Sequence, residues 1–221
     1  VTISATPAEI TYGIRYEQSF EVTIPTSSTY LPVVATVEVT NAFDQIQVKT
    51  FKITREAMNY EGTPYKPVLL GGIWWAPVNV GATTINGTDS PEDMGYLFQW
   101  GRDYGALSGT MDDIVQGPMS LAEASLPENA NKFITATTAT LDWLDPRQHD
   151  LWTGSNSRGP CPEGWRIPAK DDFQLLVDAY STNEGKPDLA NFRMELKGDD
   201  PSTTLYLPFA GYRGTSGIAQ N

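Results

Sequence analysis

Cysteine and histidine are almost absent from this chain of 221 residues, which has one of each, Cys161 and His149. A single cysteine cannot form an internal disulfide, a cysteine-rich metal site or a two-cysteine redox centre. A single histidine beside Asp150 gives a poor nucleophile–base pair, because adjacent side chains point apart in most backbones. We therefore expect no catalytic residue, no metal and no cofactor, and interpret His149 as a loop residue.

Basic residues and long apolar runs are also scarce. Lys and Arg number 15 against 27 Asp and Glu, so the formal net charge is −12. Such a field repels phosphate backbones and anionic lipids, and nucleic acid is not an expected partner. No apolar stretch approaches the roughly 20 residues that cross a bilayer. The chain begins at Val1 without an initiator methionine, and we expect a processed or excised fragment.

Aromatic residues, glycine and proline are by contrast plentiful. The chain has six Trp, ten Tyr, eight Phe, 19 Gly and 16 Pro, with 40% apolar and 19% charged residues. This composition predicts a globular protein of short strands joined by turns rather than long helices. The length allows one large domain or two modest ones.

The first part of the chain, 1–57, predicts a β-sandwich or pilin-like segment. Apolar and polar residues alternate over 20–24 and 33–39, which indicates strands with one buried face. The parity of the apolar residues then changes, so we expect a β-bulge near 49–50. A full sandwich needs about 100 residues, and we expect this segment to be part of a domain that extends upstream. Gly and Pro at 58–67 indicate a linker.

One helix stands out in the second part of the chain, at 170–180. Its apolar residues repeat at i, i+3, i+4 and i+7 and predict one buried stripe. The stripe consists of Phe173, Leu176, Val177 and Tyr180. A shorter helix is expected to begin at Ser120, with Glu123 as its capping-box partner, and to end at Pro127. Short strands are expected at 73–78, 96–100 and 205–209.

Four segments resemble one known family. They read Gly-Gly-Ile-Trp-Trp-Ala-Pro-Val-Asn-Val (71–80), Gly-Tyr-Leu-Phe-Gln-Trp-Gly-Arg (95–102), Gly-Pro-Cys-Pro-Glu-Gly-Trp-Arg-Ile-Pro (159–168) and Leu-Pro-Phe-Ala-Gly-Tyr-Arg (207–213). In this order they resemble the Fibrobacter succinogenes major paralogous domain, which is common in surface and fimbrial-tip proteins of Bacteroidetes. The resemblance covers roughly 68–221 and implies a variant of the C-type-lectin fold, related to formylglycine-generating enzymes. The predicted fold class is α+β, a C-type-lectin-like domain at 68–221 preceded by a short all-β sandwich-like segment.

The chain departs from this family at three points. Relatives carry Ser or Thr where this chain has Ala169, and the loss of that N-cap should cost about 0.5–2 kcal/mol, with Asp172 as a compensating group. Relatives often have a second cysteine near the C-terminus, whereas Cys161 has no mate in this chain. Further strands should follow Asn221, and we expect the lectin-like domain to be truncated there.

Carboxylates could in principle form a calcium site or the active site of a glycoside hydrolase. Calcium would need clustered oxygen ligands, but the pairs at 112–113 and 199–200 are better interpreted as solvated turn residues. Glycoside hydrolysis needs two carboxylates at a set separation, and nothing in the spacing selects a pair. The carboxylates available for it are Glu92, Asp93, Asp142 and Asp145. Formylglycine-generating chemistry needs two copper-binding cysteines, which one cysteine cannot supply.

Aromatic side chains are the better functional signal, because their faces stack on the apolar faces of sugars. Trp75, Trp152, Tyr212 and Arg213 are the predicted ligand-contacting residues. Trp74 and Trp75 should leave their strand on opposite faces. The alternating residues Tyr96, Phe98 and Trp100 are expected to lie mainly in the core.

The predicted function is binding rather than catalysis. We expect an exported adhesin of the cell surface, outer membrane or fimbrial tip, whose lectin-like module binds carbohydrate or, as the next choice, a host or bacterial surface protein. One alternative is a structural fimbrial subunit that binds only sister subunits by strand addition at an open edge of the β segment. Another is a glycan-active or formylglycine-generating-like enzyme, which would need a buried pocket with converging carboxylates or a metal.

Overall fold

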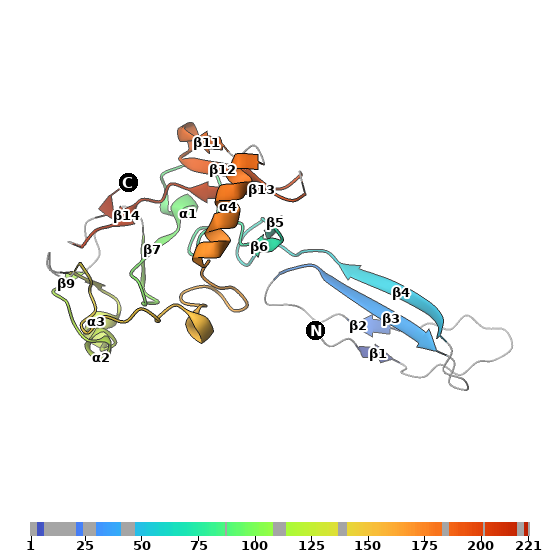
Figure 1. Cartoon of the computed structure of the whole chain (residues 1–221), viewed down its shortest axis with the longest axis horizontal. Helices are drawn as coiled ribbons and strands as arrows, with labels where there is room; N and C mark the ends of the chain where they lie inside the picture. Colours follow the sequence, from blue (N-terminus) through green and yellow to red (C-terminus); the bar gives the residue numbers. More distant parts are fainter. Residues whose placement is uncertain are drawn as a thin grey trace.

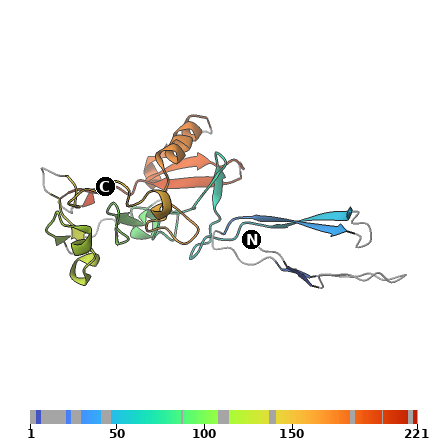
Figure 2. The same ribbon diagram turned by 60° about the horizontal axis from the view of Figure 1, so that its bottom comes forward.

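The chain is an α+β protein made of short helices and small sheets (Figure 1). The computed structural model describes residues 4–6, 21–23, 30–40, 47–86, 88–107, 114–136, 141–182, 186–200, 202–215 and 219–220. A long two-stranded ladder forms one end of the molecule, and both views place the helices and the remaining sheets toward the other end (Figures 1 and 2).

Two antiparallel ladders make up the N-terminal part, and each has two strands. They are β1 (Ser4–Thr6) with β2 (Glu21–Thr23), and β3 (Val33–Thr40) with β4 (Gln47–Arg55). Ala35 is buried while its neighbours Val34 and Thr36 are exposed, as the alternation predicts. Val39 pairs with Lys49 but Thr40 pairs with Gln47, so the irregularity falls at Val48, next to the predicted bulge. Whether these ladders belong to a sandwich stays a prediction.

The remaining strands are short and mostly paired in twos. They are β5 (Val68–Leu70), β6 (Ile73–Trp75), β7 (Tyr96–Phe98), β8 (Gly105–Leu107), β9 (Ile114–Val115), β10 (Phe133–Ile134), β11 (Lys186–Asp188), β12 (Arg193–Lys197), β13 (Thr204–Pro208), β14 (Tyr212–Arg213) and β15 (Ala219–Gln220). The three predicted strands of this part are confirmed as β6, β7 and β13, each shorter than or shifted from the expected range. The largest of the described sheets has the order β11-β12-β13.

Helices are short apart from one. They are α1 (Pro91–Met94), α2 (Leu121–Ala124), α3 (Pro127–Ala130) and α4 (Lys170–Thr182), with 3-10 turns at Gly154–Asn156 and Leu189–Asn191. The predicted capping box is confirmed at α2, where Ser120 and Glu123 bond each other's backbone N–H. Pro127 follows the end of α2 and is the first residue of α3. Proline is tolerated at that position, because a backbone N–H there would have no partner within the helix.

The first core cluster lies between α4 and the sheets β5–β6 and β12–β13. Val68, Leu70, Leu196 and Leu205 are almost fully buried there against Leu176 of the helix. The helical stripe predicted from the sequence is confirmed at Leu176 but wrong at Phe173 and Val177, which are exposed. Asp172 and Ala179 are buried in their place, so the buried face is shifted by about one residue; the Tyr180 side chain lies outside the described residues. A shift of one residue rotates the buried face by about 100°.

A carboxylate at the start of α4 explains that rotation. Asp172 accepts a hydrogen bond of 2.6 Å from the backbone N–H of Ala169 and two more from the guanidinium of Arg166. Asp172 therefore satisfies the backbone N–H of Ala169, the residue just before α4, and it turns toward the protein to do so. That this bond offsets the missing Ser or Thr cap stays a prediction. Hydrogen bonding from Arg166 holds the pKa of the Asp172 carboxyl below its usual value.

We expect Asp172→Asn to lower the free energy of unfolding by about 1–2 kcal/mol, because an amide caps and pairs less well than a carboxylate. Since the folded pKa lies below the unfolded one, the contribution of Asp172 is present at neutral pH and is lost as the pH falls through the folded pKa. Urea denaturation at neutral and acidic pH measures both effects. Asp171→Asn is the matched control, because Asp171 lies exposed in the same turn. An equal loss in the two variants would contradict this assignment.

The predicted linker at 58–67 packs against the second part of the chain. Tyr60 is buried, and its ring meets those of Tyr30 and Trp165 edge to face at 5.8 and 5.4 Å. Burial, together with Cys161, Glu61 and Tyr30 nearby, raises the pKa of Tyr60 to about 12. The boundary is therefore a fixed junction built on aromatic contacts rather than a loose connection.

Candidate functional site

Two of the predicted ligand-contacting residues line one surface hollow. The hollow has a volume of about 240 Å³, and Tyr212 and Arg213 of β14 form one wall. The other lining residues come from β7, β10 and the approach to β14: Leu97, Phe98, Phe133 and Gly211. β7 and β14 lie toward the end of the molecule opposite to the β3–β4 ladder (Figures 1 and 2).

Tyr212 and Arg213 give the hollow its chemistry. Tyr212 is 61% exposed, so much of this residue is accessible to a ligand. The guanidinium carbon of Arg213 lies 5.3 Å from the centre of the Phe133 ring, a cation–π contact that orients the side chain. An exposed ring beside an oriented donor group is an arrangement that can stack on a sugar and bond its hydroxyls.

Trp152 lies at a separate pair of rings. It meets Trp100 edge to face with ring centres 5.2 Å apart, and it is half-buried while Trp100 is 40% exposed. Trp152 does not line the hollow, so the structure divides the predicted residues between two places. Sequence reasoning missed Trp100 as an accessible residue, because it placed the alternating aromatics of 96–100 in the core.

Trp75 is not available to a ligand, which corrects the prediction made for it. Only 8% of its surface is exposed, and it belongs to the first core cluster with Leu70 and Leu176. Its indole N–H donates to the carbonyl of Leu70 at 3.3 Å. The two neighbouring tryptophans of β6 point to opposite faces of the strand. Trp75 faces the core, whereas Trp74 is half-buried.

Polar side chains fix the segment that follows β7. The Gln99 amide donates to the carbonyl of Ile134 at 2.7 Å and accepts from its N–H at 3.1 Å, so it continues the strand pairing beside β10. Trp143 donates from its indole to the carbonyl of Trp100 at 2.8 Å. The Gln99 side chain and the Trp100 carbonyl are therefore held by β10 and by Trp143.

Arg102 completes this support. It is 7% exposed and donates to the carbonyls of Asn129 at 2.8 Å and Ala130 at 3.0 Å, to that of Lys132, and to the Gln99 side chain at 3.1 Å. Its guanidinium also lies 5.6 Å from the ring centre of Trp143. The acceptors of this buried cation are mostly carbonyls at and just after the end of α3. We therefore assign Arg102 a structural role.

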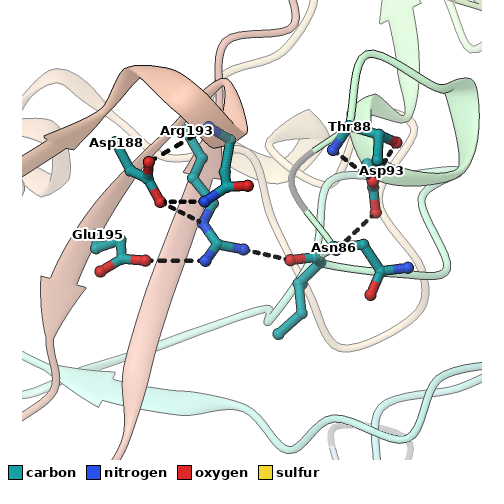
Figure 3. A network of polar contacts seen from close by, with 8 residues as sticks. Asn86, Thr88, Asp93, Asp188, Arg193 and Glu195 are labelled. Carbon is teal, nitrogen blue, oxygen red and sulfur yellow. Dashed lines mark hydrogen bonds and ion pairs between the residues drawn. The ribbon is translucent and has the colours of Figure 1, made fainter.

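Asp93 is another buried charge, with 5% of the residue exposed, and Figure 3 shows the hydrogen bonds around it. Its carboxylate accepts from the hydroxyl of Thr84 and from the N–H of Asn86 at 2.9 Å, and on its second oxygen from the N–H and hydroxyl of Thr88 at 2.8 and 2.5 Å. Burial by itself raises the pKa of Asp93, but these hydrogen bonds outweigh burial and hold the pKa below its usual value. Asp93 is thus a fixed anion that shapes the loop at 84–88.

Arg193 holds the same loop from the other side (Figure 3). It donates to the carbonyl of Ile85, to Glu195 at 2.9 Å, and forms an ion pair with Asp188 at 3.7 Å. The guanidinium lies 4.2 Å from the ring centre of Tyr206. The cavity between Asp93 and Arg193 is about 10 Å³, room for a single water. The network joins β12 to the loop, and the cavity within it is too small for a substrate.

The other candidate groups lie apart from the hollow. His149 is an exposed loop residue, and Asp142 forms an ion pair with Arg147 at 3.6 Å. Asp199 accepts from the N–H groups of Gly71 and Gly72, so it braces the turn between β5 and β6. The pair at 112–113 lies outside the described residues. In the described ranges no three His, Cys, Asp or Glu residues gather as a metal site, and no helix has the length and apolarity to cross a membrane.

Comparison with known proteins adds no relative to this description: the chain matches no family model, no curated protein and no solved structure.

Proposed function

We propose that the chain is an exported adhesin module of the cell surface or a fimbrial tip, and that it binds carbohydrate at the hollow beside Tyr212. The motifs at 71–80, 95–102, 159–168 and 207–213 support a C-type-lectin-like module of the Fibrobacter succinogenes major paralogous domain family. The short loop-joined strands and the single long helix of 68–221 are compatible with that module.

The accessible ring of Tyr212 carries the proposal. It lies at the wall of an open hollow whose other lining groups are aromatic, aliphatic and one guanidinium. Aromatic rings beside placed polar groups are a combination that carbohydrate sites use. β7 and β14, which contribute lining residues to the hollow, also lie away from the β3–β4 ladder (Figures 1 and 2), so a module carried on that ladder would present them outward.

The charged residues favour binding over catalysis. Asp93, Asp172 and Arg102 are the buried charged side chains of the described residues, and each is engaged in several hydrogen bonds that support a loop, a helix start or a helix end. None of the three lines the hollow. A general acid or base must reach the reacting proton, and these groups are already committed to the backbone.

A glycan array with the purified chain tests this function. We expect binding to a subset of saccharides, and we expect Tyr212→Ala to weaken it by about tenfold, the effect of losing roughly 1.4 kcal/mol of stacking. Phe173→Ala is the matched control, because it removes an exposed aromatic ring from α4 without touching the hollow. Binding that survives Tyr212→Ala would place the sugar site elsewhere, and an array without hits would remove the function.

Assembly with sister subunits is the second candidate. Among the described strands β3 has β4 as its only hydrogen-bonded neighbour, so its outer edge can accept a strand from another chain. The same glycan array separates the candidates, because a subunit that binds only its sisters would give no saccharide hit.

A further inference from the structure

Of the described residues that line the hollow beside Tyr212, Arg213 is the one that carries a charge. The others are uncharged: Leu97, Phe98, Phe133, Gly211 and Tyr212. In the described part of the chain, therefore, no carboxylate lines the hollow, although the whole chain has 27 Asp and Glu against 15 Lys and Arg. The charge at the hollow is opposite in sign to the net charge of the protein.

Phe133 places the guanidinium of Arg213. The Phe133 residue is buried, with 9% of its surface exposed, and the guanidinium carbon lies 5.3 Å from the centre of its ring. A cation near an aromatic face is attracted by the charge distribution of the ring, and a buried ring gives that cation a fixed surface. Phe133 is therefore a positioning residue for Arg213.

Backbone pairing joins the two segments that bring this cation and this ring together. β10 carries Phe133 and is paired in parallel with β9. Just beyond β10, the N–H of Ala136 donates to the carbonyl of Thr215 at 3.0 Å, two residues after Arg213. The segment under the ring is thus tied directly to the segment that carries the guanidinium. A donor group held in this way loses little freedom when a ligand binds, which favours affinity.

A guanidinium is suited to bind an oxyanion. It has five N–H donors in a planar fork that matches the two oxygens of a carboxylate, and charge-assisted bonds of this kind are about twice as strong as neutral ones. With five donors, Arg213 can keep its contacts within the protein and still bind a ligand. Tyr212 is 61% exposed on the same wall. A sugar with an acidic group can therefore contact both residues at once.

The number of charges narrows the class of acid. The formal net charge of −12 opposes ligands with many negative charges. At physiological ionic strength the Debye length is about 8 Å, so a group placed against Arg213 responds to the guanidinium more than to distant carboxylates. One guanidinium balances one carboxylate, whereas a phosphate group brings about 1.5–2 negative charges. The ligand that fits best is a sugar with a single carboxylate.

We propose that the hollow selects a saccharide that carries one carboxylate, as hexuronic and sialic acids do. The carboxylate lies on Arg213 and the sugar ring beside Tyr212, while Phe133 acts through Arg213. This inference rests on the proposed carbohydrate-binding function and deepens it, because it names the class of sugar that the hollow takes.

Calorimetric titration of the purified chain with matched sugars tests the selection. Methyl glucuronide is compared with its carboxyl methyl ester, and methyl sialoside with its ester, so that the members of each pair differ in the charge of one group. We expect the acid of at least one pair to bind about tenfold or more tightly than the ester, with an advantage that shrinks as salt is added. The pair that shows the advantage identifies the uronic or the sialic acid.

Variants assign the advantage to its residue. Arg213→Gln should reduce the affinity for the acid to that for the ester, and Arg213→Lys should keep only part of the advantage, because an ammonium group lacks the fork. Phe133→Leu should lower the ratio of acid to ester affinity, which a merely structural role would leave unchanged. Arg147→Gln is the matched control, since it removes an exposed cation that does not line the hollow. Circular dichroism checks that each variant is folded.

The outcomes separate this inference from the function on which it rests. Equal affinity for acid and ester, or an acid advantage that survives Arg213→Gln, would overturn the inference and leave carbohydrate binding intact. A glycan array whose hits are all neutral sugars would do the same. Tighter binding of glucose 6-sulfate than of methyl glucuronide would overturn the choice of a carboxylate. An absence of saccharide binding in both the array and the titrations would overturn the inference and the function together.

Discussion

Replacing Arg102 with methionine is expected to lower the free energy of unfolding by about 3–5 kcal/mol. The variant keeps an apolar stem but removes the guanidinium that donates to the part-buried carbonyls of Asn129, Ala130 and Lys132. The carbonyl of Asn129 keeps the backbone N–H of Lys132 as a donor, whereas each acceptor left unpaired costs about 1–3 kcal/mol. Arg102→Lys should restore only part of the loss, because an ammonium group cannot match the fork geometry of a guanidinium. Chemical denaturation followed by circular dichroism measures both variants.

Arg147→Met is the matched control for Arg102. Its side chain is 52% exposed and its ion pair with Asp142 spans 3.6 Å, and exposed pairs of this kind contribute about 0–1 kcal/mol. The comparison isolates burial and hydrogen bonding from charge. Equal stability losses for Arg102→Met and Arg147→Met would show that Arg102 does not hold α3 and the segment after β7 together.

Asp93→Asn is expected to lower the free energy of unfolding by about 2–3 kcal/mol. Each carboxylate oxygen of Asp93 accepts from one backbone N–H, that of Asn86 or that of Thr88. An asparagine amide offers one oxygen only, so in either orientation its NH₂ group faces a backbone N–H that cannot turn away. An unsatisfied buried donor costs about 1–3 kcal/mol, and the lost charge weakens the remaining bonds. Urea denaturation at neutral pH measures the change.

The pH dependence of stability gives a second measurement for Asp93. Because its folded pKa lies below the usual value, the stabilisation is present at neutral pH and is lost as the pH falls through the folded pKa. Wild type should therefore approach the stability of Asp93→Asn in acid. Asp89→Asn, at an exposed carboxylate of the same loop, is the control and should change little. A wild-type advantage that persists at low pH would contradict the role given to Asp93.

Local sequence patterns predicted where helices and strands lie better than they predicted which face of each is buried. Ser120 and Glu123 define the start of α2, and the alternation at 33–39 defines β3, because these signals act over a few residues. The buried face of α4 was misplaced, since Phe173 is more apolar than Asp172 and the periodicity alone favours it. The ion pair of Asp172 with Arg166 is a tertiary contact that the helical pattern does not contain.

The site could be predicted only in part for a related reason. Tyr212 and Arg213 follow a glycine and line the hollow, as expected of residues near Gly-rich loops. Trp75 is in the core, because pairing of β5 with β6 beneath α4 decides which neighbouring tryptophan is covered. Tyr96 and Trp100 were assigned to the core from their alternation, which cannot tell a buried face from a supported, exposed one. Gly81 and Gly105 lie against the Tyr96 side chain, but only the fold brings them to it.

The central claim is that the hollow beside Tyr212 binds carbohydrate, and a crystal structure of the chain soaked with the best saccharide from the glycan array tests it most directly. We predict a sugar ring in the hollow, stacked on Tyr212 and close to Arg213. Saccharide bound at another surface, with the hollow empty, would contradict the account.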